Sequence, residues 1–265
     1  MQIIRNKIRP KSGGIIRRYA GFTAGLLIMF SCLAYAQQNI LIISDFEKID
    51  HFPSQPWEII QLNEKFPPTK YQVIDWDGVT AVKAVAEGSM ALLARPVEVN
   101  LDKTPVLCWR WRVGHVIDSA DLLSKAGDDY AARVYVSFKL PSKAIGFGTR
   151  IKLGLARKLY GDHVPDAAIN YVWDNTHPAG TQVPNAYTDR TQMLVVRSGN
   201  DDAGRWVEER RDVQADFNEI FAVQGGSLIQ VAIASDTDNT GGSARAGFAD
   251  LHFVSRDQSC EFSLL

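Results

Sequence analysis

The chain has 265 residues, of which 46% are hydrophobic and 22% charged, and its formal net charge is −1. Six of its 29 lysines and arginines lie between Arg5 and Arg18, where no acid occurs, so the rest of the chain is acidic. An acidic body argues against nucleic acid or an anionic membrane surface as a partner. The length is sufficient for one large domain with a substantial core.

The N-terminal segment, residues 1–36, has the pattern of a secretory signal peptide. Its basic stretch is followed by a short apolar run, Ala20–Leu33, and then by Ala34–Ala36, which fits the small-x-small cleavage rule. The run is shorter than the roughly 20 residues that span a bilayer, which disfavours an N-terminal transmembrane anchor. A twin-arginine signal and a lipid-modified cysteine are weaker alternatives. We expect cleavage before Gln37, a periplasmic or secreted product and no stable membrane anchor afterwards.

Short strands separated by turns are expected along residues 37–265. The expected strands are 39–47, 70–75, 80–86, 90–94, 106–113, 128–138, 170–173, 192–198, 206–213, 227–235 and 247–254, with 80–86 and 90–94 as a hairpin. Helical spacing occurs at 142–160 and 215–221, and Trp57 is expected to anchor an irregular stretch in the core. With no repeat or linker, this pattern predicts a single all-β domain, an antiparallel β-sandwich of jelly-roll type.

Two alternating strands carry the main site hypothesis. In Val106–Val113 and Asp128–Phe138, apolar residues alternate with arginines and other polar residues. If the two strands are antiparallel neighbours, Arg110, Arg112 and Arg133 gather on one surface. Arginines on a partly buried surface need acids or an anionic group as partners.

The polar segment Ser235–Gly242 follows a strand whose Ala232 and Ala234 leave room above the sheet. Asp236, Asp238 and Thr240 before a glycine resemble the opening of a calcium loop. The twelfth position is Gly247 rather than glutamate, which excludes an EF-hand. A different calcium site and an Asx-rich turn that caps its own backbone both stay open.

Together these strands predict one binding face for a saccharide or a similar polar small molecule. Its residues are Arg110, Arg112, Asp128, Asp129, Arg133, Tyr135, Asp236, Asp238 and Asn239. Aromatic planes for stacking on sugar rings could come from Tyr135, Tyr171, Trp173 and Tyr187. The alternative is an ion-pair lattice that only stiffens the sheet.

A catalytic role has weaker support. Asp128, Asp129 and Asp236 are candidate catalytic acids, and Glu208 could complete a general acid/base pair. The chain has no Gly-rich phosphate loop and no Cys/His zinc spacing, which closes the usual routes to a nucleotide or zinc enzyme. A carbohydrate-active hydrolase or lyase therefore stays an alternative to a non-catalytic binding module.

A metal site and a disulfide are two further possibilities. Asp45 and Glu47 near the start could meet Asp250 in the last strand and hold a structural calcium, as often happens in jelly-roll sugar-binding modules, which this pattern resembles. No other cofactor is expected. Cys108 and Cys260, which remain after cleavage, form either a disulfide or a buried free thiol and an exposed one, since sequence alone cannot bring their Cα atoms within reach.

Several sequence blocks in order resemble an uncharacterised bacterial family, domain of unknown function 3047. They are Trp109–Val113, Asp128–Val136, Asn170–Trp173, Trp206 with Glu208, Glu209 and Arg211, and Ser235–Gly241. The resemblance runs from about Ile40 to Phe253, although Ala222 stands where that family is expected to carry glycine. It implies an exported envelope protein but no catalytic residue. A looser likeness to galactose-binding-type jelly rolls agrees with the expected sandwich.

Overall fold

The computed structural model describes residues 40–46, 52–160 and 164–263. The expected signal peptide lies outside these residues and stays a prediction. Within the described ranges, no helix is long and apolar enough to cross a membrane.

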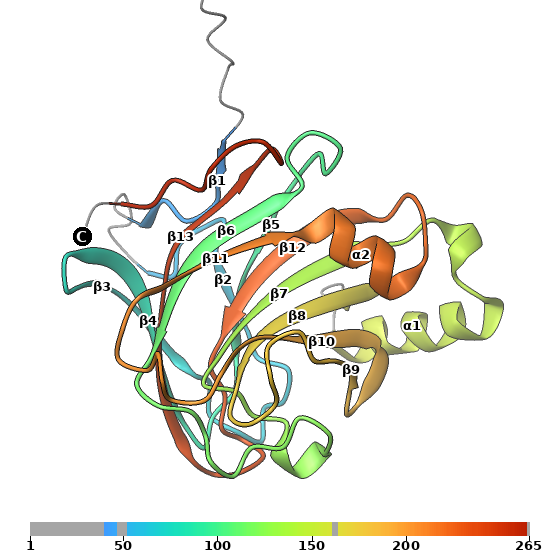
Figure 1. Ribbon diagram of the computed structural model, residues 1–265. Coiled ribbons are helices and arrows are strands. Elements are labelled where there is room, and N and C mark those ends of the chain that lie inside the picture. The colour runs from blue at the N-terminus through green and yellow to red at the C-terminus, as the bar shows by residue number, and fades with distance from the viewer. Residues whose placement is uncertain (1–39, 47–51, 161–163, 264–265) are drawn as a thin grey trace, which may run out of the picture. The chain divides into compact units, whose positions relative to one another are not determined.

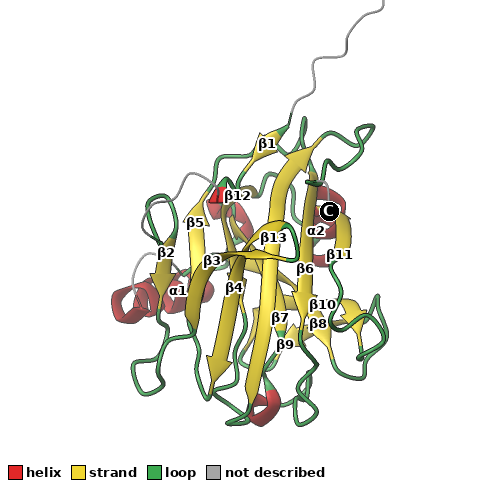
Figure 2. Ribbon diagram, turned by 90° about the vertical axis from the view of Figure 1, so that its left-hand side faces the viewer, coloured by secondary structure: helices red, strands yellow, loops and turns green. Residues whose placement is uncertain are grey.

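The described residues form two β-sheets packed face to face (Figure 1). The first sheet has the strand order β11–β6–β13–β4–β3, and β1 also pairs with β13. Its strands are β1 (Leu41–Ile42), β3 (Lys70–Trp76), β4 (Val79–Glu87), β6 (Val106–Val113), β11 (Val207–Asp212) and β13 (Ser243–Val254). Figure 2 faces this sheet and shows β13 running between β4 and β6.

The second sheet has the order β2–β5–β12–β7–β8–β10–β9. Its strands are β2 (Glu58–Ile60), β5 (Leu92–Pro96), β7 (Ala132–Lys139), β8 (Ala167–Asp174), β9 (Gln182–Asn185), β10 (Thr188–Ser198) and β12 (Ser227–Ala234). β8 and β10 pair in parallel, and the other paired strands are antiparallel. From β4 to β7 and from β10 to β13, successive strands alternate between the sheets, as in a jelly roll. The predicted antiparallel β-sandwich is confirmed.

The core lies between the sheets and follows the alternation of the strands. Leu107, Trp109, Trp111 and Val113 of β6 and Ala132, Val134, Val136 and Phe138 of β7 all point into it. Trp57 is buried there as predicted. Each large apolar side chain moved out of water contributes about 1.5–3 kcal/mol, which fixes which face of each strand points inward.

The expected pairing of β6 with β7 is wrong. β6 lies in the first sheet and β7 in the second, so the two strands face each other across the core instead of lying side by side. Their apolar sides do share one core, but their polar sides lie on opposite faces of the sandwich. The expected hairpin of 80–86 with 90–94 is wrong for the same reason, since β4 and β5 belong to different sheets.

In the described part of the chain, two α-helices complete the fold, α1 (Phe147–Tyr160) and α2 (Val213–Phe221), as the helical spacing predicted. The carboxylate of Asp212 caps α2 by accepting a hydrogen bond from the Ala215 N–H at 2.9 Å. Phe217 packs against Phe138, with ring centroids 4.4 Å apart. The helix ends at Ala222, whose φ of 50° is left-handed, the conformation in which glycine is favoured.

The segment 255–263 is fixed to the outer face of the first sheet. Cys260 forms a disulfide with Cys108 of β6, with Cα atoms 5.8 Å apart. Next to it, the Phe262 ring lies 5.8 Å from the guanidinium of Arg110. The disulfide settles the question that the sequence left open.

Candidate functional site

A groove crosses the outer face of the second sheet, and small residues on the strands create it. Two neighbouring cross-strand rows form its floor. One row contains Tyr135 and Asn170, and the next runs Gln230, Ser137, Ala168 and Thr191. Alanine and serine at these positions leave a hollow of about 500 Å³ between larger neighbours. Ala232 and Ala234 of β12, which were expected to leave room above the sheet, do not line this hollow, because they are buried in a cluster with Ile60, Leu92 and Met90.

The two ends of the groove differ in chemistry. Over β2 and β5 it is walled by apolar side chains, namely Ile60, Leu62, Met90 and Leu92. Toward β9 and β10 it is lined by Asn185, Tyr187, Thr188 and Thr191, together with Asp128, Asp238 and Asn239 from two loops. Those loops, which precede β7 and follow β12, form one wall of the groove. Leu122 and Tyr130 hold the first of them against Val172 on the sheet.

Arg133 is the central cation of the groove. It is 3% exposed, and its Nη2 donates to the Asp236 carboxylate at 2.6 Å. The rings of Tyr130 and Tyr135 each lie 5.1 Å from the guanidinium, which holds it between two aromatic faces. Its Nε is buried without a hydrogen-bond partner, as is Oδ1 of the fully buried Asn170 on the neighbouring strand.

Two of the four aspartates are occupied inside the protein. Asp129 accepts hydrogen bonds from the backbone N–H groups of Asn239 at 3.1 Å and Thr240 at 2.7 Å, so it caps the turn after β12. Asp236 is fully buried against Arg133. The Asx-rich turn that the sequence left open is present, and it is capped both by Asp129 from the other loop and by its own Thr240, whose hydroxyl accepts from the Gly242 N–H at 3.3 Å.

The other two aspartates line the groove. Asp128 accepts from Nδ2 of Asn185 at 3.0 Å and from the Tyr130 hydroxyl at 3.2 Å. Asp238 lies half-buried beside it at the groove edge. Next to them, the Tyr187 hydroxyl donates to Oδ1 of Asn239 at 2.9 Å.

Burial and like charges shape the ionisation of this cluster. Burial raises the pKa of Asp238, and the neighbouring Asp129 raises it further, while Arg133 opposes both. Burial also raises the pKa of Asp236. Burial acts to lower the pKa of Arg133, but Asp236 and its other neighbours raise the pKa above the usual value, so the guanidinium stays charged.

Sequence comparison now decides the family. The protein-family model described as "Protein of unknown function (DUF3047)" matches residues 55–252. The chain belongs to this family. The resemblance noted in the sequence is thereby confirmed, and comparison with curated proteins finds no match to this DUF3047 protein.

Solved structures similar to this DUF3047 chain include two xyloglucanases. A family 12 xyloglucanase from Bacillus licheniformis matches with a TM-score of 0.34 and 12% identity, over 77% of this chain and 88% of that one. The xyloglucanase domain of NopAA from Sinorhizobium fredii, solved with cellobiose, matches with a TM-score of 0.34 and 6% identity, over 76% and 98%. Scores this low transfer no activity to the DUF3047 chain.

The sequence placed Arg110 and Arg112 on the same face as Arg133, and this is wrong. Both project from the outer face of the first sheet, on the opposite side of the sandwich. Arg110 pairs there with Asp250, and Arg112 pairs with Asp77. The reason is topological, since the three arginines share a face only if β6 and β7 are neighbours within one sheet. Asp128, Asp129, Arg133, Tyr135, Asp236, Asp238 and Asn239 do come together in the DUF3047 protein.

The remaining candidate residues also lie in different parts of the structure. Tyr171 and Trp173 are buried in the core, whereas Tyr135 and Tyr187 line the groove. Glu208 belongs to β11 of the first sheet, so it does not meet the groove aspartates. The sequence did not predict Asn170 or Asn185 as site residues. Neither the alternation of β8 nor the length of the β9–β10 connection distinguishes them from their neighbours.

The proposed calcium ligands are only partly described. β1 does pair with β13, as expected, but Glu47 lies outside the described residues. The Asp250 carboxylate already binds Arg110 and accepts from the Ser263 hydroxyl at 2.7 Å. A second acidic group, Asp129 with Asp236 and Asp238, has carboxylate oxygens within 4.8 Å of one another. Calcium at either place stays a prediction.

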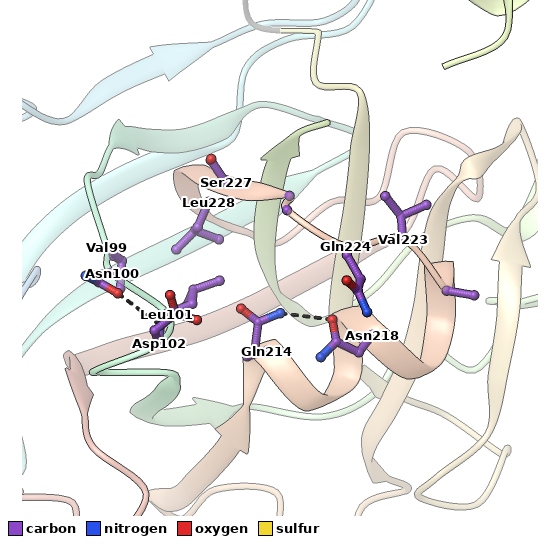
Figure 3. Close-up of a pocket in the computed structure, with 13 residues that line it drawn as sticks. Val99, Asn100, Leu101, Asp102, Gln214, Asn218, Val223, Gln224, Ser227 and Leu228 are labelled. Atoms are coloured by element: carbon purple, nitrogen blue, oxygen red, sulfur yellow. Dashed lines mark hydrogen bonds between the residues drawn. The ribbon is translucent and has the colours of Figure 1, made fainter. Parts of the chain in front are cut away.

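A second hollow, of about 660 Å³, lies between α2 and the segment 99–102 (Figure 3). The side chains of Asn100, Gln214 and Asn218 are already hydrogen-bonded within the protein. Nε2 of Gln214 donates to Oδ1 of Asn218 at 3.0 Å, and Oδ1 of Asn100 accepts from the Asp102 N–H at 3.0 Å. Among its lining residues, no buried polar side-chain atom lacks a partner. The groove on the second sheet is therefore the better candidate site.

Proposed function

We propose that this protein is an exported envelope protein that binds a saccharide chain in the groove of the second sheet. The observation that carries this proposal is the pair of unpartnered buried atoms at the groove floor, Nε of Arg133 and Oδ1 of Asn170. One atom needs an acceptor and the other needs a donor. A sugar hydroxyl can fill either role, because it both donates and accepts.

Shape and surface chemistry support the same ligand class. From β5 to β10 the groove crosses five strands, or roughly 19 Å at the usual spacing, which suits a chain of sugar units better than a single small molecule. Tyr135 and Tyr187 offer ring faces for the apolar faces of sugars. A partner for a buried polar atom recovers about 1–3 kcal/mol of desolvation cost.

A hydrolase in the same groove is the second candidate. Asp238, whose pKa is raised by burial, and Asp128, which is held by Asn185, line one cavity in different environments. Such a difference is how paired carboxylates divide acid and base roles. Of the three aspartates first considered for catalysis, only Asp128 faces the groove, because Asp129 and Asp236 are occupied.

A thermal-shift scan against neutral, acidic and amino oligosaccharides tests the proposal. A ligand at 100 times its Kd adds about 2.7 kcal/mol of stability, which raises the Tm by about 5–10 °C for a domain of this size. Incubation of the same sugar, with product analysis, separates binding from hydrolysis. Turnover that is lost in Asp128→Asn supports the hydrolase, and a flat response across the panel contradicts both candidates in favour of a scaffold protein.

Asn170→Leu is the informative variant, because it removes the amide with little change of shape. Oδ1 of Asn170 has no partner in the protein, and Nδ2 donates only a long hydrogen bond to Sδ of Met193 at 3.7 Å. The free energy of unfolding should therefore fall only slightly, while affinity for the sugar falls at least tenfold. Asn218→Leu, in the hollow beside α2, is the matched control and should bind normally. Equal affinity in the two variants contradicts a site at the groove floor.

A further inference from the structure

The groove has an excess of negative charge at its polar end, and this restricts which saccharide fits. Arg133 and Asp236 neutralise one another. Asp128, Asp129 and Asp238 remain, and among the described residues none of the three forms an ion pair with a lysine, arginine or histidine. The nearby cation, Lys125, lies at the rim with its ammonium 5.2 Å from the Tyr187 ring centroid.

The unpartnered acceptors favour a ligand with hydrogen-bond donors. Oδ1 of Asn170 lines the groove from a fully buried residue, and Oδ1 of Asp236 is buried behind it without a partner. Asp128 and Asp238 add carboxylate oxygens at the wall. The Tyr187 ring, 56% exposed, presents a face that attracts cations.

The ionisation of the neighbouring groups agrees with a negative site. The pKa of the Tyr187 hydroxyl is raised by burial and then by Asp128, Asp238 and Asp129. A carboxylated sugar brought to this end would meet the same repulsion.

From these contacts we infer that the groove takes an amino sugar with a free ammonium group, seated between Asp128, Asp238 and Tyr187. This inference rests on the proposed saccharide function and specifies its substrate class. The ammonium donates to the two carboxylates and lies against the tyrosine face, and the neighbouring units continue over Tyr135 toward the apolar end. Acetylation of the amine removes both its charge and two of its donors.

Isothermal titration with two matched hexamers tests the inference, one of β-1,4-linked glucosamine and one of β-1,4-linked N-acetylglucosamine. The titrations are run with the whole mature protein below pH 6.5, with a chelator present. We expect the glucosamine hexamer to bind at least tenfold more tightly. Asp238→Asn should abolish this preference while retaining weaker binding. Glu219→Gln, an equal charge change on the exposed face of α2, should leave the preference intact.

The outcomes separate the two proposals. Equal or tighter binding of the acetylated hexamer overturns the ammonium site and leaves the saccharide groove in place. A preference that persists in Asp238→Asn also overturns it. Binding that appears only when calcium replaces the chelator assigns the acidic group to a metal ion and overturns the ammonium site. If neither these hexamers nor any neutral glucan binds, the proposed function fails as well.

Discussion

The two outer faces of the sandwich each hold a buried arginine on a central strand, and they use it differently. On the first sheet, Arg110 is held between Asp250 and the Phe262 ring, and the segment that carries Phe262 is joined to β6 by the disulfide. On the second sheet, Arg133 is held between two tyrosines and Asp236 beside an open groove. The buried arginine holds the segment 255–263 in place on one face and, by our proposal, contributes to ligand binding on the other.

The comparison indicates that the role of a buried arginine depends on whether another segment of the chain covers it. Arg110 borders a smaller hollow of about 340 Å³, whose other two arginines, Arg197 and Arg205, pair with Asp202. The groove by Arg133 stays open because the floor residues around it are small. We therefore expect changes on the first face to alter stability alone, and changes on the second to alter ligand binding too.

Removing the disulfide should give the largest effect. Cys108 and Cys260 are 152 residues apart in sequence, and closing so long a loop contributes about 4–5 kcal/mol by restricting the unfolded chain. Cys108→Ala with Cys260→Ala should lower the free energy of unfolding by that amount, measured by urea denaturation. Saccharide affinity of the folded fraction should not change, and a tenfold loss of affinity would show that the two faces are coupled.

Removing Arg133 should affect both properties. Arg133→Met leaves Asp236 buried without its cation, which should cost about 3–5 kcal/mol of stability. The double variant Arg133→Met/Asp236→Leu replaces the pair with apolar groups and should recover most of this loss, again measured by urea denaturation. Neither variant should bind saccharide. If the double variant binds normally, Arg133 contributes only to stability and the contrast between the faces disappears.

A change at Ala222, outside both faces, gives a smaller effect. This residue ends α2 with a φ of 50°, and a left-handed conformation costs a residue with a Cβ about 1–2 kcal/mol. Ala222→Gly should therefore stabilise the protein by about 0.5–1 kcal/mol, after allowance for the greater freedom of glycine in the unfolded chain. No change in saccharide affinity is expected by isothermal titration, because Ala222 lines the hollow beside α2 and not the groove.

The pH dependence of Asp238 should give the smallest effect on stability. Its pKa is raised in the folded protein, so the folded state binds this proton more tightly than the unfolded state does. The stability from this group is greatest at acid pH and is lost as pH rises through the raised pKa. Asp238→Asn should thus stabilise the protein at pH 7, by less than about 1 kcal/mol for so exposed a group.

The gain should shrink as pH falls toward the ordinary pKa of an aspartate and should vanish below it, where the carboxyl is neutral in both states. Urea denaturation of both proteins at pH 7 and pH 4 measures it. A larger gain at pH 4 than at pH 7 would contradict the raised pKa.

The sequence predicted the sandwich because burial imposes period two on each strand. The face of each residue in β6, β7 and β8 follows directly from that alternation, as Trp109 and Arg133 illustrate. Alternation does not reveal which strands are neighbours, however. Arg110 and Arg133 have the same parity relative to the core, and only the assignment of β6 and β7 to different sheets separates them by the thickness of the sandwich.

The groove acids were predictable for a second reason. Asp128 and Asp238 lie next to strands that pair in the second sheet, β7 and β12, at the ends that antiparallel pairing brings together. Asn185 was not predictable, because it depends on β9 folding back against β10 beyond a parallel pair. Ile229 has the same parity as the core residues Val231 and Ile233, but it is 36% exposed because a bulge between Leu228 and Gln230 shifts the register.

The contrast between the two faces is tested most directly by a crystal structure of the mature protein with the oligosaccharide that gives the largest thermal shift. Our account predicts sugar density over Tyr135 and Asn170, with the chain directed across β12, β7 and β8. Sugar bound instead on the first sheet beside Trp76 and Trp206, or in the hollow between α2 and the segment 99–102, would contradict it.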